Sequence, residues 1–149
     1  MSDVKKIMEM IKEHDITYVD LRFTDIAGKM QHVTQHIDTI DENALTEGFM
    51  FDGSSIAGWK AINESDMTLM PDLYRAYIDP FFAQPTLALF CDVLEPSSGE
   101  AYDRDPRGTA KAALAHIESL GIADTAFFGP EAEFFIFEDV KIDVSMNRG

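Results

Sequence analysis

The spacing of apolar residues predicts that the chain opens with a helix followed by a β-hairpin. Apolar positions near the start fall three or four residues apart, as on one face of a helix: Val4, Ile7, Met8 and Ile11. Ser2 can cap the first turn of this helix, which ends near His14–Asp15. From Ile16 to Thr24 the pattern alternates as in a strand, and the turn residues Asp25–Gly28 lead into a return strand over Lys29–Thr34.

Further along, the pattern predicts a short helix, an irregular loop and three more strands. Asp41–Gly48 has acidic residues in its first turn and glycine at its end, which is typical of a short helix. Phe49–Asp66 combines glycine with short polar residues and a tryptophan, which favours a structured functional loop over a strand. Strand patterns resume after this loop, over Met67–Met70, Tyr74–Ile78 and Thr86–Val93.

The composition changes near Glu95–Gly99, where proline, serine and glycine cluster as in a linker or an exposed turn. We therefore expect one domain over 1–103 and the beginning of a second domain over 104–149. Just after this boundary, Asp105 is suited to cap a helix and Pro106 to occupy the first helical position.

The second unit carries the best-marked helix of the chain, with Gly121 as its stop. A strongly apolar strand is expected to follow over Thr125–Glu138. Because one helix and a strand pair rarely form an independent core, we expect 104–149 to be the incomplete opening of a larger domain. The expected buried stripe of the helix comprises Ala110, Ala113, Leu114, Ile117 and Leu120.

The acidic balance of the chain limits its partners. Among 149 residues, 12 Lys and Arg stand against 27 Asp and Glu, which gives a formal net charge of -15 at pH 7. Such a surface repels phosphate backbones and anionic headgroups, so we expect no nucleic acid and no membrane as partner. The single cysteine, Cys91, cannot form an intrachain disulfide, and no apolar stretch suits a leader or a membrane span. A reduced, cytoplasmic location is therefore expected.

Two glutamates in the apolar segment FFGPEAEFFIF, Glu131 and Glu133, form the clearest candidate site. On a strand they would share one face, with Cα atoms about 6.5–7 Å apart. Two desolvated carboxylates so close together must take up a proton or meet a cation, and their hard oxygens favour Mg²⁺ or Mn²⁺ over zinc. The alternative, about equally favoured by the sequence, is an edge strand that carries two solvated charges.

The loop Phe51–Trp59, which reads FDGSSIAGW, carries a second candidate site. Asp52 lies beside flexible backbone, where it could act as a base or bind a cation, while Ser54 and Ser55 could donate hydrogen bonds. The loop lacks the Gly-Lys-Ser/Thr of a P-loop, so it is not expected to bind phosphate by that motif. A plain Asp-Gly turn is the simpler alternative, and Trp59 is more often a packing residue than a substrate platform.

Four segments carry a resemblance that spans essentially the whole chain, including the spacing between them: FMFDGSSIAGWKAINESDMTLMPD, YIDPFF, EAYDRDPRG and FFGPEAEFFIF. Together they resemble the amino-terminal part of bacterial type I glutamine synthetase. The resemblance implies an α+β protein in which a small β-grasp domain precedes a large catalytic domain. It also implies the ATP-dependent ligation of ammonia to L-glutamate through γ-glutamyl phosphate, by a homo-oligomer built as a dodecamer of two six-membered rings.

The same resemblance implies roles for individual residues. Asp52 would help to bind ammonium and remove its proton, with Ser55 in the same loop, and this loop would complete the active site of the neighbouring subunit. Glu133 would ligate the metal that organises glutamate, and Glu131 the metal at the nucleotide phosphates, the metal being Mg²⁺ or Mn²⁺. The family's other metal ligands and its glutamate and ATP pockets lie downstream, so this chain alone is expected to be inactive.

Two other interpretations stay open on the sequence. The chain could be a non-catalytic acidic β-grasp module that binds or regulates a protein partner. It could also be a ligase that uses another amine in place of ammonia, although the FDGSS and NESDM motifs favour the glutamine-forming branch. Mn²⁺ binding that is lost when Glu131 or Glu133 is replaced by alanine would favour the enzyme over the binding module.

Overall fold

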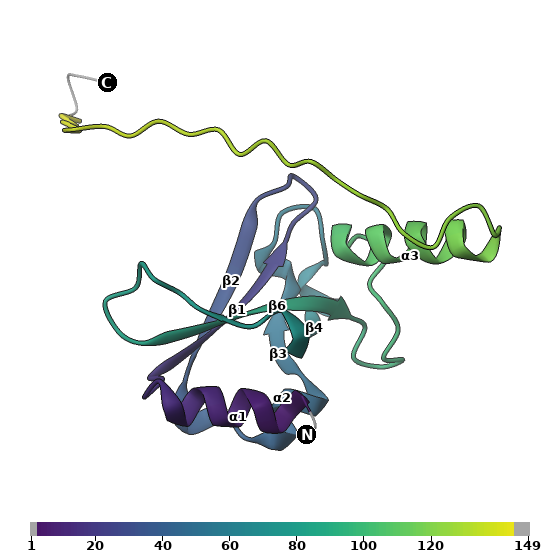
Figure 1. Ribbon diagram of the computed structural model, residues 1–149, viewed down its shortest axis with the longest axis horizontal. Helices are drawn as coiled ribbons and strands as arrows, with labels where there is room; N and C mark the ends of the chain where they lie inside the picture. The colour runs from purple at the N-terminus through teal and green to yellow at the C-terminus, as the bar shows by residue number, and fades with distance from the viewer. Residues whose placement is uncertain (1–2, 145–149) are drawn as a thin grey trace.

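The computed structural model describes residues 3–144 and shows an α+β architecture, as the sequence predicts (Figure 1). Three α-helices and six β-strands are joined by four short 3₁₀ turns, which lie at Ile37–Thr39, Gly53–Ser55, Ile62–Glu64 and Leu73–Arg75. The helices are α1 (Asp3–Glu13), α2 (Glu42–Glu47) and α3 (Pro106–Ser119). The strands are β1 (Tyr18–Thr24), β2 (Met30–His36), β3 (Phe49–Asp52), β4 (Asp66–Pro71), β5 (Tyr77–Ile78) and β6 (Thr86–Leu94).

The strands form one mixed sheet in the order β2-β1-β6-β4-β3, and β5 pairs with β6 off this path. β1 and β6 run parallel, with Tyr18 opposite Thr86 and Arg22 opposite Phe90, whereas the other pairs are antiparallel. Strand β6 therefore joins the β1–β2 hairpin to the β3–β4 pair. In Figure 1, α1 and α2 lie together beside one end of the sheet, and α3 lies at the opposite end.

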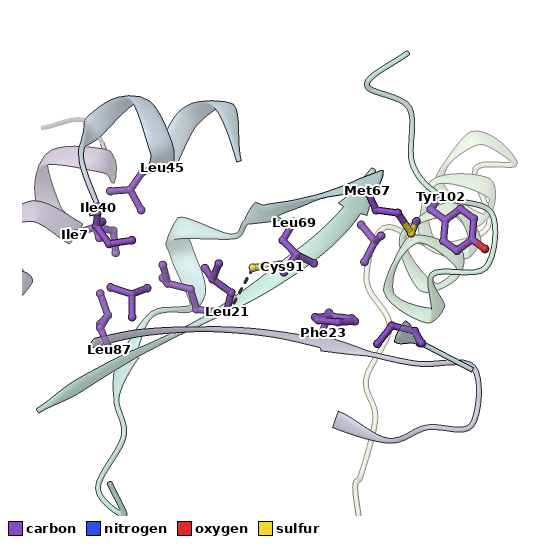
Figure 2. Close-up of a cluster of buried hydrophobic side chains, with 14 of the residues drawn as sticks. Ile7, Leu21, Phe23, Ile40, Leu45, Met67, Leu69, Leu87, Cys91 and Tyr102 are labelled. Carbon is purple, nitrogen blue, oxygen red and sulfur yellow. Dashed lines mark hydrogen bonds between the residues drawn. The ribbon is translucent and has the colours of Figure 1, made fainter. Parts of the chain in front are cut away.

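One elongated hydrophobic core lies along the sheet and is covered at one end by helices α1 and α2, because alternate residues of the strands face it. At one end, Ile7 of α1 and Leu45 of α2 lie near Leu87 of β6; at the other, Phe23 and Met67 lie near Tyr102 (Figure 2). The loop after β3 and the segment before α3 thus pack on the same end of one core.

Most of the predicted elements in the first hundred residues are confirmed. Helix α1 ends at Glu13, and Asp15 adopts a positive φ of 48° just beyond it, as at many helix ends. Helix α2 is capped by Asp41, whose side chain accepts the amide proton of Ala44, and it ends at Gly48 with φ 86°. The predicted capping role of Ser2 lies outside the described residues.

Two predictions in this part of the chain need correction. Phe49–Asp66 is not irregular throughout, because Phe49–Asp52 forms strand β3 against β4. The strand expected over Tyr74–Ile78 begins only at Tyr77, because Asp72 caps a 3₁₀ turn over Leu73–Arg75 by accepting the amide proton of Tyr74.

The predictions for the second unit are confirmed at its start and wrong beyond it. Asp105 caps α3 and Pro106 begins it, but the expected stripe of this helix is exposed apart from the half-buried Ile117. The expected strand over Thr125–Glu138 is absent from the described chain, where this segment is extended and solvent-exposed (Figure 1). Both features have the apolar pattern of buried elements, yet residues 3–144 supply nothing that covers them. None of the described helices is long and apolar enough to cross a bilayer.

Candidate functional site

The loop that follows β3 presents the first pair of candidate residues to solvent. Asp52 is the last residue of β3, and its carboxylate accepts hydrogen bonds from the backbone amide of Ser54 at 2.9 Å and from the Ser54 hydroxyl at 2.6 Å. These bonds cap the 3₁₀ turn Gly53–Ser55. Asp52 and Ser55 are both exposed. The simple turn and the candidate site are therefore the same piece of structure, with an acid held in place at its start.

Gly53 allows the backbone of the loop to pass close to the side chain of Met67 where the loop leaves the sheet. Its amide donates to the carbonyl of Ser65 at 2.7 Å, and a Cβ atom built at this position would lie 2.3 Å from the sulfur of Met67. Met67 is fully buried, so a larger residue here would have to displace part of the core. The sequence places glycine where the backbone of the loop passes directly over the core.

Trp59 anchors the far end of the loop, which confirms its expected packing role. It is 6% exposed, and its ring lies 5.5 Å from Phe23, 6.3 Å from Phe51 and 5.3 Å from Tyr102, measured between centroids. The Trp59 indole N–H is buried and has no hydrogen-bond partner in the described part of the chain. Ile56 is buried as well, so the two largest apolar side chains of the loop face the core.

The electrostatics of Asp52 favour a negative charge. Hydrogen bonds from the hydroxyl and backbone of Ser54, with a further contribution from Ser65, lower the pKa of Asp52 below its usual value despite some desolvation. The carboxylate is therefore ionised at neutral pH. A carboxylate with a lowered pKa keeps its charge and is a weaker proton acceptor than an ordinary aspartate.

The predicted metal pair lies elsewhere in the structure. Glu131 and Glu133 are exposed on the extended segment after α3, which passes above the β1–β2 hairpin in Figure 1 without joining the sheet. Because this segment is not a strand, the shared strand face that motivated the prediction is absent. Within residues 3–144 no three His, Cys, Asp or Glu side chains gather as a metal site. The chain thus does not bring the two glutamates to Asp52.

The donor chemistry of the two glutamates nevertheless suits a hard divalent cation, because carboxylate oxygens are the ligands that Mg²⁺ and Mn²⁺ prefer. Both side chains are fully available for coordination, since they are exposed. Two carboxylates leave most positions of an octahedral ion unfilled, so further ligands must come from outside the described residues.

One residue that contacts the loop was not expected from the sequence. Arg104 donates hydrogen bonds from Nη1 to the carbonyl of Gly58 and, at 3.4 Å, to that of Trp59. Asp105, in the same segment, caps α3 as the sequence predicts. Arg107, however, pairs with the distant Asp72 and Asp92. No sequence signal indicated that Arg104 reaches back across 45 residues.

Comparison with known proteins identifies two families along the chain. Residues 15–96 match the family described as "Glutamine synthetase, beta-Grasp domain", which confirms the expected β-grasp fold. Residues 103–148 match the family described as "Glutamine synthetase, catalytic domain".

Relatives of known name cover nearly all of this chain, which spans only about a third of their length. A glutamine synthetase from Azospirillum brasilense is 64% identical over 148 residues, which are 99% of this chain and 32% of that protein. A 3-hydroxylaminophenol mutase from Cupriavidus pinatubonensis is 56% identical over 143 residues, or 96% of this chain and 30% of that protein.

Solved structures agree with these relationships. Plasmodium falciparum glutamine synthetase, determined by electron cryomicroscopy, superposes with a TM-score of 0.72 at 25% identity. The superposition covers 81% of this chain and 23% of that one. The β-grasp match alone covers more than half of the chain, and the high-identity relatives cover nearly all of it. The chain therefore belongs to the glutamine synthetase family.

Proposed function

We propose that this chain provides the amino-terminal part of an enzyme that ligates ammonia to L-glutamate with ATP, through γ-glutamyl phosphate. The single observation that carries the proposal is the 64% identity to the Azospirillum brasilense glutamine synthetase across almost the whole chain. The chain spans about a third of that relative, so residues outside it must supply most of the active site. We expect the 149 residues alone to be inactive.

The loop after β3 supplies the ammonium side of this reaction. The ionised, solvent-facing carboxylate of Asp52 suits the binding of NH₄⁺, and the hydroxyl oxygen of Ser55 in the same turn can accept a hydrogen bond from the ammonium. Loss of a proton turns ammonium into nucleophilic NH₃. The lowered pKa of free Asp52 supports binding in this chain, and proton removal requires a neighbourhood that raises this pKa again.

Glu131 and Glu133 would hold Mg²⁺ or Mn²⁺ together with ligands from outside the described residues. The ion neutralises charge on phosphate oxygens during phosphoryl transfer when it is bound. The chain's own contribution is the pair of carboxylates, separated by a single residue on an exposed segment. ATP is a substrate here, and its pocket lies mostly outside this chain.

The same family membership supports a proposal about the assembly. We propose a cytoplasmic homo-oligomer, the dodecamer of the family, in which the loop after β3 completes the site of a neighbouring copy. The exposure of Asp52 and Ser55 on the outside of the β-grasp unit supports this arrangement. We also propose that the chain divides into one domain over 1–103 and the beginning of a second over 104–149. The two family matches support this division, because the first ends at residue 96 and the second begins at residue 103.

The test is a chimera in which residues 1–149 replace the matching part of the Azospirillum brasilense relative. We expect it to form glutamine from glutamate, ammonium and ATP. Asp52→Asn should lower this activity by about 100-fold or more, the range for loss of a group that handles a proton. Asp38→Asn, the same change at an exposed aspartate after β2, is the matched control. Full activity of the Asp52→Asn chimera would contradict the role of the loop.

The metal ligands are tested in the same chimera by titration with Mn²⁺, with the free ion followed by electron paramagnetic resonance. Glu131→Gln and Glu133→Gln should each weaken Mn²⁺ binding by about 10-fold or more. Loss of a residue that only supports a metal ligand already weakens metal binding by about 10–100-fold, so loss of a direct ligand should cost at least as much. Glu138→Gln, another exposed glutamate on the segment, serves as control. Unchanged Mn²⁺ affinity in both variants would overturn the assignment.

The mutase relative supports a second candidate function, an isomerisation of 3-hydroxylaminophenol, because it is 56% identical over nearly the whole chain. The two candidate functions use different substrates: the ligase uses glutamate, ammonium and ATP, and the mutase uses 3-hydroxylaminophenol. Conversion of 3-hydroxylaminophenol by the chimera, absent from the parent Azospirillum brasilense protein, would favour the mutase. Glutamine formation without such conversion favours the ligase.

A further inference from the structure

The loop that carries Asp52 is fixed at two places. At its start, the amide of Gly53 donates to the carbonyl of Ser65. At its end, the carbonyls of Gly58 and Trp59 both accept hydrogen bonds from Arg104. The exposed residues of the loop lie between these two attachments, so their position depends on both.

The attachment at Arg104 is transmitted back to Asp52 by consecutive turns. The amide of Trp59 donates to the carbonyl of Ile56 at 3.1 Å, and the amide of Ile56 donates to the carbonyl of Gly53, also at 3.1 Å. The carboxylate of Asp52 in turn holds the amide of Ser54. A shift of the Gly58 carbonyl therefore moves a hydrogen-bonded chain that ends at Asp52.

Arg104 is itself placed by the segment before α3. The amide of Tyr102 donates to the carbonyl of Val93 at 2.8 Å. The carboxylate of Asp105 accepts the amide proton of Val93. Within residues 3–144, Arg104 forms no ion pair, so its guanidinium serves these carbonyls alone. Both hydrogen bonds come from the same nitrogen, Nη1, whose two N–H groups can each be directed at one of the two carbonyls.

We propose that Arg104 is a positioning residue that orients the loop after β3 for the capture of ammonium. This inference rests on the proposed function, because it assigns Arg104 to the ammonium side of that reaction. Arg104 touches no reacting atom itself. It acts from the far side of the boundary at residue 103, so it links the start of the second unit to a loop of the first.

The first test measures the kinetics of the chimera with each of the three substrates. Arg104→Met should raise the KM for ammonium about 10-fold, the order expected for loss of a hydrogen bond to a charged group, while kcat changes much less. The KM values for glutamate and ATP should not change. Arg104→Lys should lie between Arg104→Met and the wild type. Arg75→Met, the same change at an exposed arginine in another loop, is the control and should leave all these values unaltered.

A second test follows hydrogen exchange in the 149-residue chain and does not depend on catalysis. Amides of residues 53–59 should exchange faster in Arg104→Met, while those of β6 keep their wild-type rates. Unchanged exchange in this loop would overturn the inference, and so would an equal rise in all three KM values, which marks a general loss of structure. The two proposals can fail separately. If the Asp52→Asn chimera keeps wild-type activity while loop amides exchange faster in Arg104→Met, the proposed function of the loop is refuted, but Arg104 does hold the loop in place.

Discussion

Asp105 joins helix α3 to strand β6: one carboxylate oxygen caps the helix at the amide of Arg107, and the other accepts the amide proton of Val93 at 3.1 Å. The side chain is 1% exposed. A single buried acid thus satisfies two backbone donors that belong to different elements. It fixes where the segment before α3 leaves the sheet.

Replacement of Asp105 by alanine should destabilise the protein by about 1–3 kcal/mol, because it removes a helix cap and leaves the buried amide of Val93 without an acceptor. The measurement is urea unfolding at neutral pH, followed by circular dichroism. Asp103→Ala, at an exposed aspartate two residues away, should change the stability by less than about 0.5 kcal/mol. Equal effects of the two substitutions would show that the buried contacts of Asp105 contribute nothing.

Asp20 gives the stability of the sheet a dependence on pH. Burial raises the pKa of this carboxyl, but hydrogen bonds from Arg22, His32 and Thr34 outweigh it and hold the pKa below the usual value. A pKa that is lower in the folded than in the unfolded state stabilises the fold above about pH 4. This contribution is lost as the pH falls through the folded-state pKa.

Asp20→Asn should therefore cost about 1–3 kcal/mol at pH 7, since charged hydrogen bonds are replaced by weaker ones. The difference from the wild type should narrow below about pH 4, where the carboxyl of the unfolded wild-type chain takes up a proton, and narrow further as the pH falls through the lower folded-state pKa. Urea titrations of both proteins at neutral pH and at several acidic pH values measure this difference. If the difference in the free energy of unfolding between the two proteins stays constant at all these pH values, Asp20 does not titrate as its contacts indicate.

Gly53→Ala should destabilise the protein by about 1–3 kcal/mol, the usual cost of overpacking a core, because the new methyl group meets the buried side chain of Met67. Gly129→Ala provides the matched comparison, since a methyl group there meets no atom within 4 Å. Thermal unfolding of the two variants and the wild type is sufficient to decide. If Gly53→Ala is as stable as Gly129→Ala, the backbone of the loop lies further from Met67 than the structure places it.

Cys91 should be nearly inert toward thiol reagents in the folded protein. Burial raises its pKa to about 12, and the side chain is completely buried in the hydrophobic core. Reaction with a disulfide reagent near neutral pH should be slower by orders of magnitude in buffer than in concentrated urea. Rapid labelling of the native chain would reveal an opening of β6, the central strand on which Cys91 lies.

The local elements of the first domain could be predicted because their signals are local. Helix α2 follows from its capping acid Asp41 and from Gly48, and the β1–β2 hairpin follows from alternation on both sides of a glycine turn. The pairing of β1 with β6 could not be predicted in this way. It brings Tyr18 opposite Thr86, and alternation within a strand does not name a distant partner.

The errors in the second unit have a common physical cause. An apolar pattern such as Phe134–Phe137 shows which residues need burial, but burial also requires a covering surface. The described chain supplies none, and these side chains are exposed. The loop carrying Asp52 could be recognised because its signal is local. The hydrogen bond from Arg104 to that loop could not be predicted, because it depends on the tertiary structure.

The position of β6 in the middle of the sheet also governs how the chain reaches its native state. Before residues 86–94 are available, the β1–β2 hairpin and the β3–β4 pair have no strand between them, and each leaves an open edge. Formation of the sheet must then close a loop of more than sixty residues between β1 and β6, which slows folding relative to a helical protein of this size. During synthesis on the ribosome, the two strand pairs stay separate until the last strand has emerged, and this is the interval in which the domain is most prone to aggregation.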